Sequence, residues 1–217
     1  MGVNLFFWLF LAVMGAVLWY GWAGEKKRRE ALQRVAGQLG FVYKGDADLA
    51  VLGAAHGLRL FSLGSRQTIS NLMERQDSDS RSAVFDYRYT TGSGKRRHST
   101  RVTVFLLEKP GMLLPRFYLR PENIFHKLGA AMGYQDFDFT GNPIFSKQYL
   151  LQGDNELAVR GLFQPSIVSF FEQNPGWQVE GAGTSLILCR ELQCIPVEKM
   201  PDFIQQTARL AALFQTH

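Results

Sequence analysis

The chain has 217 residues, a formal net charge of +5 and a sequence pI of about 9.3. Once an apolar N-terminal segment is set aside, roughly 190 residues remain, enough to bury one sizeable core without disulfides or metals. Cys189 and Cys194 are the only cysteines. They are too few for a disulfide framework, and they lack the close spacing and the second pair that a zinc site needs.

The first 24 residues carry no charged side chain. The apolar run from Leu5 to Trp22 would extend roughly 27 Å as a helix, close to the hydrocarbon thickness of a bilayer. Trp8 lies near one end of the run and three aromatic residues lie near the other, where amphipathic rings favour the headgroup zone. We therefore predict a transmembrane anchor over residues 1–24. The basic membrane stop that follows it comprises Lys26, Lys27, Arg28 and Arg29.

A cleavable signal peptide is the alternative, but it requires a basic start, a shorter apolar core and a small-residue cleavage site. The start carries only its terminal amine and Gly21-Trp22-Ala23 is at best a poor cleavage site, so we predict that the segment is retained. Because basic residues beside a span stay on the cytoplasmic side, we expect a single-pass protein of the inner membrane. Its N-terminus would face out, and residues 25–217 would be cytoplasmic.

Residues 25–40 predict a juxtamembrane helix that continues the anchor. Leu32, Val35, Ala36 and Leu39 form one apolar stripe, and Gly40 is suited to end the helix. Short apolar strands are predicted next, over Gly57 to Ser62 and around Thr68 to Met73.

The strongest local signal is a β-hairpin formed by Ala83 to Tyr89 and Thr100 to Leu107, with Gly92 and Gly94 between them. In an antiparallel pair, facing residues keep a constant sum of sequence numbers. A register that pairs Phe85 with Val104 makes one face wholly apolar. It places Asp86 opposite Thr103, and Arg88 opposite Arg101, on the other face. A slip of one residue would turn the aromatic rings away from their partners.

The rest of the chain predicts further alternating elements. Arg116 to Arg120 is a strand, Pro121 opens a helix that ends at Gly133, and Asp154 caps a helix that reaches Phe163. The remaining predicted elements are a helix opened by Pro165, a hairpin of Trp177 to Glu180 with Thr184 to Arg190, and a last helix over Pro201 to Gln215. Helices mixed with antiparallel strands predict an α+β fold in which flanking helices cover a largely antiparallel sheet.

Residues 41–217 are predicted to form this α+β domain, in which two strand-rich halves meet near residue 140. Residue identity between the halves is too thin to establish a duplication.

We find no catalytic signature and predict that the protein is not an enzyme and needs no cofactor or metal. The Gly92-Ser93-Gly94-Lys95 segment lacks the earlier glycine, the following Ser/Thr and the strand-to-helix context of a P-loop, so we interpret it as a turn. The Asp-x-Asp pairs do not continue into a calcium loop. His126 has no nearby nucleophile or second ligand in the sequence, and Cys189 ends an apolar run that predicts a buried thiol.

Two groups of basic residues are candidates for contact with anions or lipid. Lys95, Arg96, Arg97 and Arg101 belong to the hairpin, although a solvated hairpin tip is the simpler interpretation, because runs of charge usually indicate solvent exposure. Arg116 and Arg120 flank Tyr118 on one face of a strand, where they could grip phosphate. The alternatives for this face are cation–π packing and cross-strand pairing with Asp86 or Glu108.

The anchor together with the segments 85–89, 114–122 and 145–149 resembles uncharacterised bacterial proteins that combine one N-terminal span with a cytosolic α+β domain. The resemblance covers most of the length and implies this architecture, without an activity that could be carried over.

Two functional hypotheses follow. The first is a non-enzymatic, membrane-tethered interaction domain that acts as an accessory or assembly subunit of an inner-membrane complex. Small side chains at Ala12 and Ala16 would permit close helix contacts within the bilayer. The second is a sensor or binder of anionic lipid or nucleotide. Expected partners are membrane lipid and other membrane proteins, with no nucleic acid. The oligomeric state is left open.

Overall fold

The computed structural model describes residues 2–122, 137 and 141–215. Over these residues it contains one eight-stranded sheet with the strand order β1-β2-β3-β4-β8-β7-β5-β6. Every neighbouring pair is antiparallel. The strands are β1 Val42–Ala47, β2 Ser65–Gln76, β3 Arg81–Thr91, β4 His98–Glu108, β5 Leu114–Pro121, β6 Tyr149–Gly153, β7 Trp177–Gly183 and β8 Ser185–Arg190.

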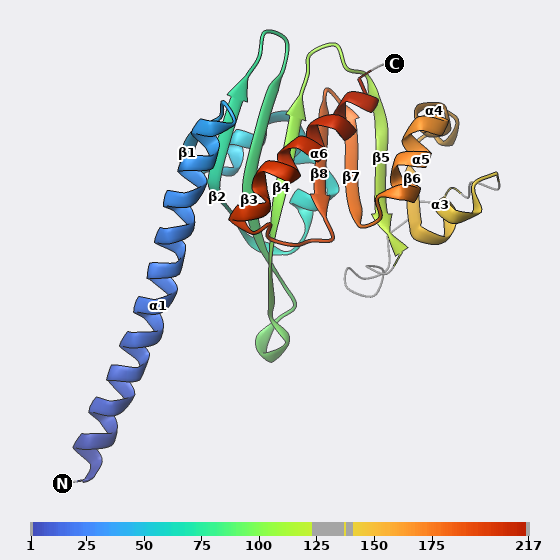
Figure 1. Ribbon diagram of the computed structural model, residues 1–217. Coiled ribbons are helices and arrows are strands. Elements are labelled where there is room, and N and C mark those ends of the chain that lie inside the picture. The colour runs from blue at the N-terminus through green and yellow to red at the C-terminus, as the bar shows by residue number, and fades with distance from the viewer. Residues whose placement is uncertain (1, 123–136, 138–140, 216–217) are drawn as a thin grey trace.

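Helices flank this sheet (Figure 1), so the predicted α+β class is confirmed. The α-helices are α1 Gly2–Gln38, α3 Pro143–Gln148, α4 Glu156–Leu162, α5 Pro165–Gln173 and α6 Met200–Leu213. The 3-10 helices are η1 Leu49–Gly57, η2 Arg59–Ser62, η3 Gly94–Arg96 and η5 Val197–Lys199.

Helix α1 is one unbroken helix of 37 residues. Among the described residues its N-terminal part, from Phe6, is the one helix that is long and apolar enough to span a membrane. Its C-terminal part packs on the sheet through the predicted stripe, because Leu32 and Ala36 are buried and Val35 and Leu39 pack against the same core. Gly40, at φ +74°, ends the helix as predicted, since a left-handed conformation favours glycine.

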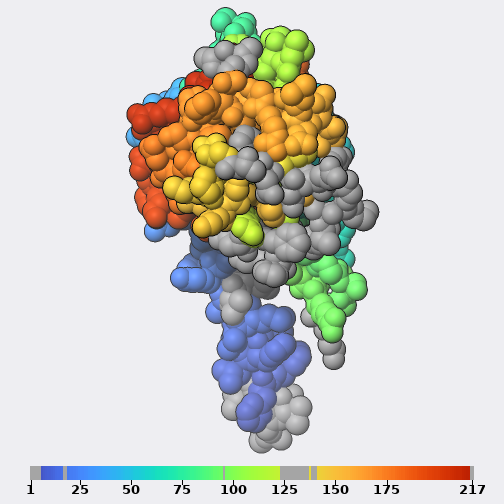
Figure 2. Space-filling model, turned by 90° about the vertical axis from the view of Figure 1, so that its right-hand side faces the viewer, coloured from blue at the N-terminus to red at the C-terminus, as the bar shows by residue number. Residues whose placement is uncertain are grey.

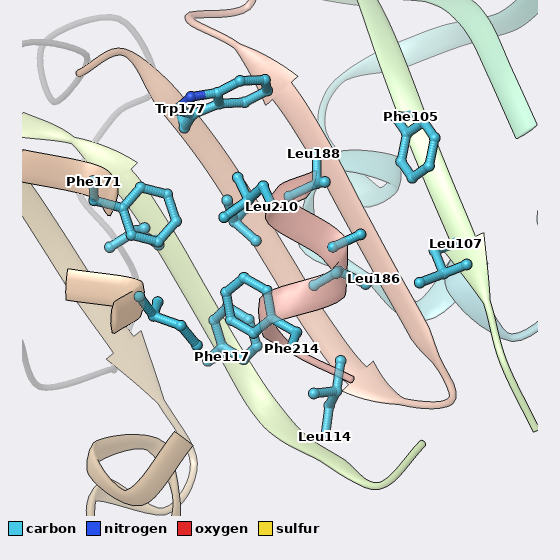
Figure 3. Close-up of a cluster of buried hydrophobic side chains, with 14 of the residues drawn as sticks. Phe105, Leu107, Leu114, Phe117, Phe171, Trp177, Leu186, Leu188, Leu210 and Phe214 are labelled. Atoms are coloured by element: carbon cyan, nitrogen blue, oxygen red, sulfur yellow. The ribbon is translucent and has the colours of Figure 1, made fainter. Parts of the chain in front are cut away.

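The sheet separates two hydrophobic cores. The larger core contains the stripe of α1, helices α4, α5 and α6, and one face of the sheet. Within it Phe117 of β5 stacks on Phe214 at the end of α6, with the ring centroids 5.6 Å apart, and Leu210 lies beside this pair (Figure 3). The smaller core lies between η1 and η2 and the opposite face of β3, β4 and β8.

The β3–β4 hairpin has the predicted register: Phe85 faces Val104, Asp86 faces Thr103 and Arg88 faces Arg101. Tyr87 and Phe85 enter the smaller core as expected. The strand around Thr68 to Met73, the strand over Arg116 to Arg120, the helix opened by Pro165, the second hairpin and the last helix are confirmed as well, with small shifts of their ends.

Several predictions need correction. Gly57 to Ser62 is not a strand but lies in η1 and η2, where adjacent residues such as Leu60 and Phe61 are both buried instead of alternating. The cap of α4 is Asn155, whose side chain accepts a hydrogen bond from the Ala158 N–H, and not Asp154. The helix predicted over Pro121 to Gly133, with His126, lies almost wholly outside the described residues.

Candidate functional site: the junction of helix α1 with the sheet

A buried polar site surrounds Asp86 of β3, at the point where α1 first meets the sheet. Asp86 is only 1% exposed, on the face opposite the aromatic residues of the hairpin. Arg28 of α1 donates from Nε to Oδ2 and from Nη2 to Oδ1, both at 3.1 Å. This bidentate geometry matches the planar fork of a guanidinium to a carboxylate. Arg28 therefore fixes α1 to β3 in one position.

Besides the Cys194 thiol, three further side chains donate to the same carboxylate. Arg101 Nη2 and Asn71 Nδ2 reach Oδ2 at 2.9 Å, and the Thr103 hydroxyl reaches Oδ1 at 2.7 Å. Arg101 also pairs with Glu25 of α1. The two carboxylates, Glu25 and Asp86, thus balance the two guanidinium groups, which is what burial of charge requires.

A β-bulge places Asn71 in this network. The register of β2 against β3 shifts between Ser70 and Met73, and Asn71 there has φ +54°. Asparagine tolerates this left-handed conformation better than most residues, and bulges re-aim side chains. Tyr43 of β1 donates to Asn71 Oδ1 at 2.9 Å, so β1 also takes part in fixing the amide.

The electrostatics of the junction favour the ionised carboxylates. Burial alone would raise the pKa of Asp86, but the charge of Arg28, the Thr103 hydrogen bond and the charge of Arg101 outweigh it and hold that pKa below its ordinary value. The hydrogen bond from Arg101 likewise lowers the pKa of Glu25. Cys194, whose Sγ lies 3.6 Å from Asp86 Oδ1, has a pKa raised by its burial and by Asp86, so it stays a thiol.

A groove of about 650 Å³ runs along α1 beside this junction. One wall is the face of α1 that carries Lys27, Ala31 and Arg34, and the other is the segment around Pro196 and Pro201 that leads into α6. Glu198 is the single acidic residue among its lining residues, against three basic ones that include Arg28. The groove is open to solvent and has a net positive lining.

A second buried polar cluster lies elsewhere, between β7 and η2. Glu180 is 1% exposed, and it accepts hydrogen bonds from the Leu60 N–H at 3.1 Å and from Gln178 Nε2 at 3.3 Å. Burial raises the pKa of Glu180 to about 7. Arg59 of η2 lies over the Tyr118 ring, 4.8 Å from its centroid. These contacts fix η2 on the sheet, which gives Glu180 a structural role.

The predicted anion-binding residues do not form one site. Lys95 and Arg96 lie in η3 at the hairpin tip, and Arg96 and Arg97 are exposed. Arg101 is instead engaged in the junction by Glu25 and Asp86. The prediction that Arg116, Tyr118 and Arg120 share an exposed face is wrong for the last two.

Tyr118 is 7% exposed and Arg120 only 1%, because that face of β5 is covered. The Arg120 guanidinium lies 6.0 Å from the Tyr118 ring centroid. This contact is the cation–π packing that was the predicted alternative to phosphate binding. Arg116 is partly exposed, and it donates to the Gly57 carbonyl at 2.9 Å and lies 3.6 Å from Asp154.

Two residues of the predicted membrane stop contact the sheet domain. Arg28 binds Asp86, and Arg29 binds the exposed Asp46 at 2.9 Å. Lys26 and Lys27 are exposed, with Lys26 over the Trp22 ring. Half of the cluster thus contacts the sheet domain. The junction was not predicted from the sequence, although the Asp86–Thr103 and Arg88–Arg101 pairs of the predicted hairpin indicate a polar face.

No group of three or more metal-ligating side chains comes together among the residues that the structure describes. Cys189 is buried, as its apolar run predicted.

No family model matches this chain, and no curated protein matches it significantly. A solved structure, the mycobacterial trehalose monomycolate transport factor A, TtfA, has the same fold. The TM-score is 0.60 at 14% sequence identity, and the match covers 86% of this chain and 91% of that one. At this identity the similarity establishes the fold alone. It supports the α+β architecture derived above.

Proposed function

We propose that this chain is a membrane-tethered, non-enzymatic interaction subunit of an inner-membrane protein assembly. In this proposal α1 is a single-pass anchor with its N-terminus outside, and the sheet domain is cytoplasmic. Accessory proteins of this kind work by holding a binding surface at a fixed place near the bilayer. The resemblance to TtfA, a protein named as a transport factor, supports an accessory role in a transport assembly.

The observation that carries the proposal is the ion-pair junction between α1 and the sheet. An anchor followed by a flexible linker would let the domain move freely. Here the helix leaves the apolar segment without a break, and within one turn Glu25 and Arg28 bind Arg101 and Asp86. The domain therefore has a defined position relative to the anchor, which is the property that a docking subunit requires.

The groove beside α1 is the surface we assign to the partner. It begins at Gly24, where the apolar segment ends, so a segment that enters it would also leave the membrane beside α1. Its apolar walls and the excess of Lys27 and Arg34 over Glu198 fit a segment with apolar and acidic side chains. We therefore expect an acidic juxtamembrane segment of a neighbouring membrane protein.

Site-specific photocrosslinking in native membranes tests this assignment. A crosslinking amino acid at Arg34, in the groove, should give a discrete adduct with a membrane protein, while one at Gln205, exposed on α6, should not. The double substitution Lys27→Glu and Arg34→Glu should abolish the partner's co-purification. Recovery of only the free monomer at both positions would count against the proposal.

A further inference from the structure

The β3–β4 hairpin projects beyond the rest of the sheet on the same side as the N-terminal half of α1, and two views at right angles agree on this (Figures 1 and 2). We infer that the tip of this hairpin, residues 92–98, is a second membrane contact that binds anionic lipid headgroups beside the anchor. The inference depends on the proposed anchoring by α1. It adds a site of lipid recognition, which the anchor alone would not provide.

The position of the tip follows from the junction. Arg101 of β4 binds Glu25 of α1, so these two residues lie at the same level. From Arg101 the strand continues three residues to His98, which adds about 10 Å at the rise of a β-strand. Along α1, about 10 Å corresponds to roughly seven residues, which leads from Glu25 back close to Trp19.

That level of α1 has the composition of a membrane interface. Trp19, Tyr20 and Trp22 are all more than 60% exposed to the surroundings of the helix. Aromatic residues of this kind gather at the headgroup layer at the end of a span. The hairpin tip thus reaches the depth at which lipid headgroups would surround α1.

The charge of the tip fits that layer and not the hydrocarbon. From Tyr87 to Leu107 the sequence contains no Asp or Glu. The basic residues of this stretch are Arg88, Lys95, Arg96, Arg97 and Arg101, of which Arg101 is neutralised at the junction. Arg96, Arg97 and His98 are exposed. Because arginine in hydrocarbon is costly while headgroup phosphates bind it, the tip would settle at the surface.

The turn chemistry keeps the tip compact. Gly92 has φ +74°, and a Cβ there would lie 2.4 Å from the Arg96 carbonyl oxygen, so only glycine fits this approach. The turn closes over Ser93 with the Arg96 N–H donating to the Ser93 carbonyl at 3.1 Å. Two adjacent arginines therefore follow a short, closed loop that presents them together.

An environment-sensitive fluorophore at Ser93 tests the contact in the full chain. Ser93→Cys would be labelled in a Cys194→Ser background, where the remaining Cys189 is buried, and the protein placed in nanodiscs that contain headgroup-spin-labelled lipid. With phosphatidylglycerol present, the Ser93 label should be quenched. A label at Ser78, in the exposed turn at the opposite end of β3, should not be quenched.

Charge dependence provides the second readout. Each basic residue contributes about fivefold to headgroup association, so Arg96→Gln with Arg97→Gln should shift the contact equilibrium about 25-fold toward the free tip. Arg160→Gln with Arg209→Gln, an equal charge change on α4 and α6, should leave the quenching unchanged. Salt at about 1 M, where the Debye length falls to ~3 Å, should reduce it.

The outcomes separate this inference from the proposed function. Absence of quenching at Ser93 in a protein that stays embedded in the nanodisc would overturn the lipid contact alone. Equal quenching in pure phosphatidylcholine would overturn recognition of anionic lipid. A chain that fails to insert, and that alkaline carbonate extracts from native membranes, would instead overturn the anchoring.

Discussion

Arg28 and Asp86, 58 positions apart in the sequence, join the helix that carries the apolar segment to β3 of the sheet through an ion pair with two hydrogen bonds. Their side chains are 15% and 1% exposed, so the pair is shielded from solvent. Such a pair fixes the orientation of α1 relative to β3, because few orientations of the planar guanidinium allow both hydrogen bonds to the carboxylate. The junction thus sets how the sheet domain sits on α1.

Loss of the Asp86 charge should destabilise the folded protein strongly. Asp86→Asn leaves the Arg28 and Arg101 guanidinium groups without their buried counter-charge, and we expect the free energy of unfolding to fall by about 3–5 kcal/mol. Urea unfolding of the full chain in mild detergent measures this. The matched control is Asp46→Asn, which removes the partner of Arg29 in an exposed pair and should cost at most about 1 kcal/mol. Equal losses in the two variants would contradict the role of the junction.

Glu180 should make stability depend on pH near neutrality. Burial raises its pKa from 4.5 to about 7, so the folded protein binds the proton more tightly than the unfolded chain. This stabilisation is complete below about pH 4.5 and is lost as the pH rises through 7, a change of about 3 kcal/mol. Unfolding measured at about pH 5 and about pH 8 should show it.

Glu180→Gln should flatten that dependence, because the amide does not titrate. Glu156→Gln, at an exposed carboxylate on α4, is the control and should retain the wild-type slope. Asp86 does not interfere, because its lowered pKa affects stability only as the pH falls below about 4. An unchanged slope in Glu180→Gln would show that this carboxylate is not the source.

Two glycines with similar positive φ angles should differ in their tolerance of alanine. Gly64 has φ +63° and Gly94 φ +56°, so both substitutions carry a left-handed penalty of about 1–2 kcal/mol. At Gly64 the new Cβ would also lie 2.3 Å from the Thr90 carbonyl oxygen, while at Gly94 the space is open. Gly64→Ala should therefore cost about 1–3 kcal/mol more, measured as a difference in unfolding free energy. Similar costs would argue against the close approach of the turn between η2 and β2 to β3.

Helix α6 should contribute to stability mainly through its buried leucine. Leu210 is fully buried against the sheet (Figure 3), and Leu210→Ala should cost about 2–5 kcal/mol through lost transfer energy and a cavity. Leu157→Ala on α4 makes the same chemical change at a side chain that is 84% exposed, and it should cost less than about 0.5 kcal/mol. The two values, from parallel denaturation curves, should differ severalfold. A small loss at Leu210 would mean that α6 is not firmly packed.

Local pattern was enough to predict the hairpin. Phe85, Tyr87 and their partners must share one face to be buried, and antiparallel geometry then assigns every facing pair, including Asp86 with Thr103. The stripe of α1 and its end at Gly40 were likewise encoded within a few turns. In contrast, β1 and β6 were not predicted, because their sequence pattern of apolar and polar residues is weak. Their strand conformation depends on pairing with β2 and β5.

The sequence by itself determined an apolar segment with a basic flank, the α+β class and the register of the central hairpin, because each depends on neighbouring residues or on one periodic pattern. Only the tertiary structure decided that Arg28 would bind Asp86 instead of remaining a surface charge, and that Arg120 would be buried instead of exposed. It also decided that the hairpin tip would project along α1. These features depend on which distant segments cover each face of the sheet, and periodicity specifies which residues share a face without specifying what covers it.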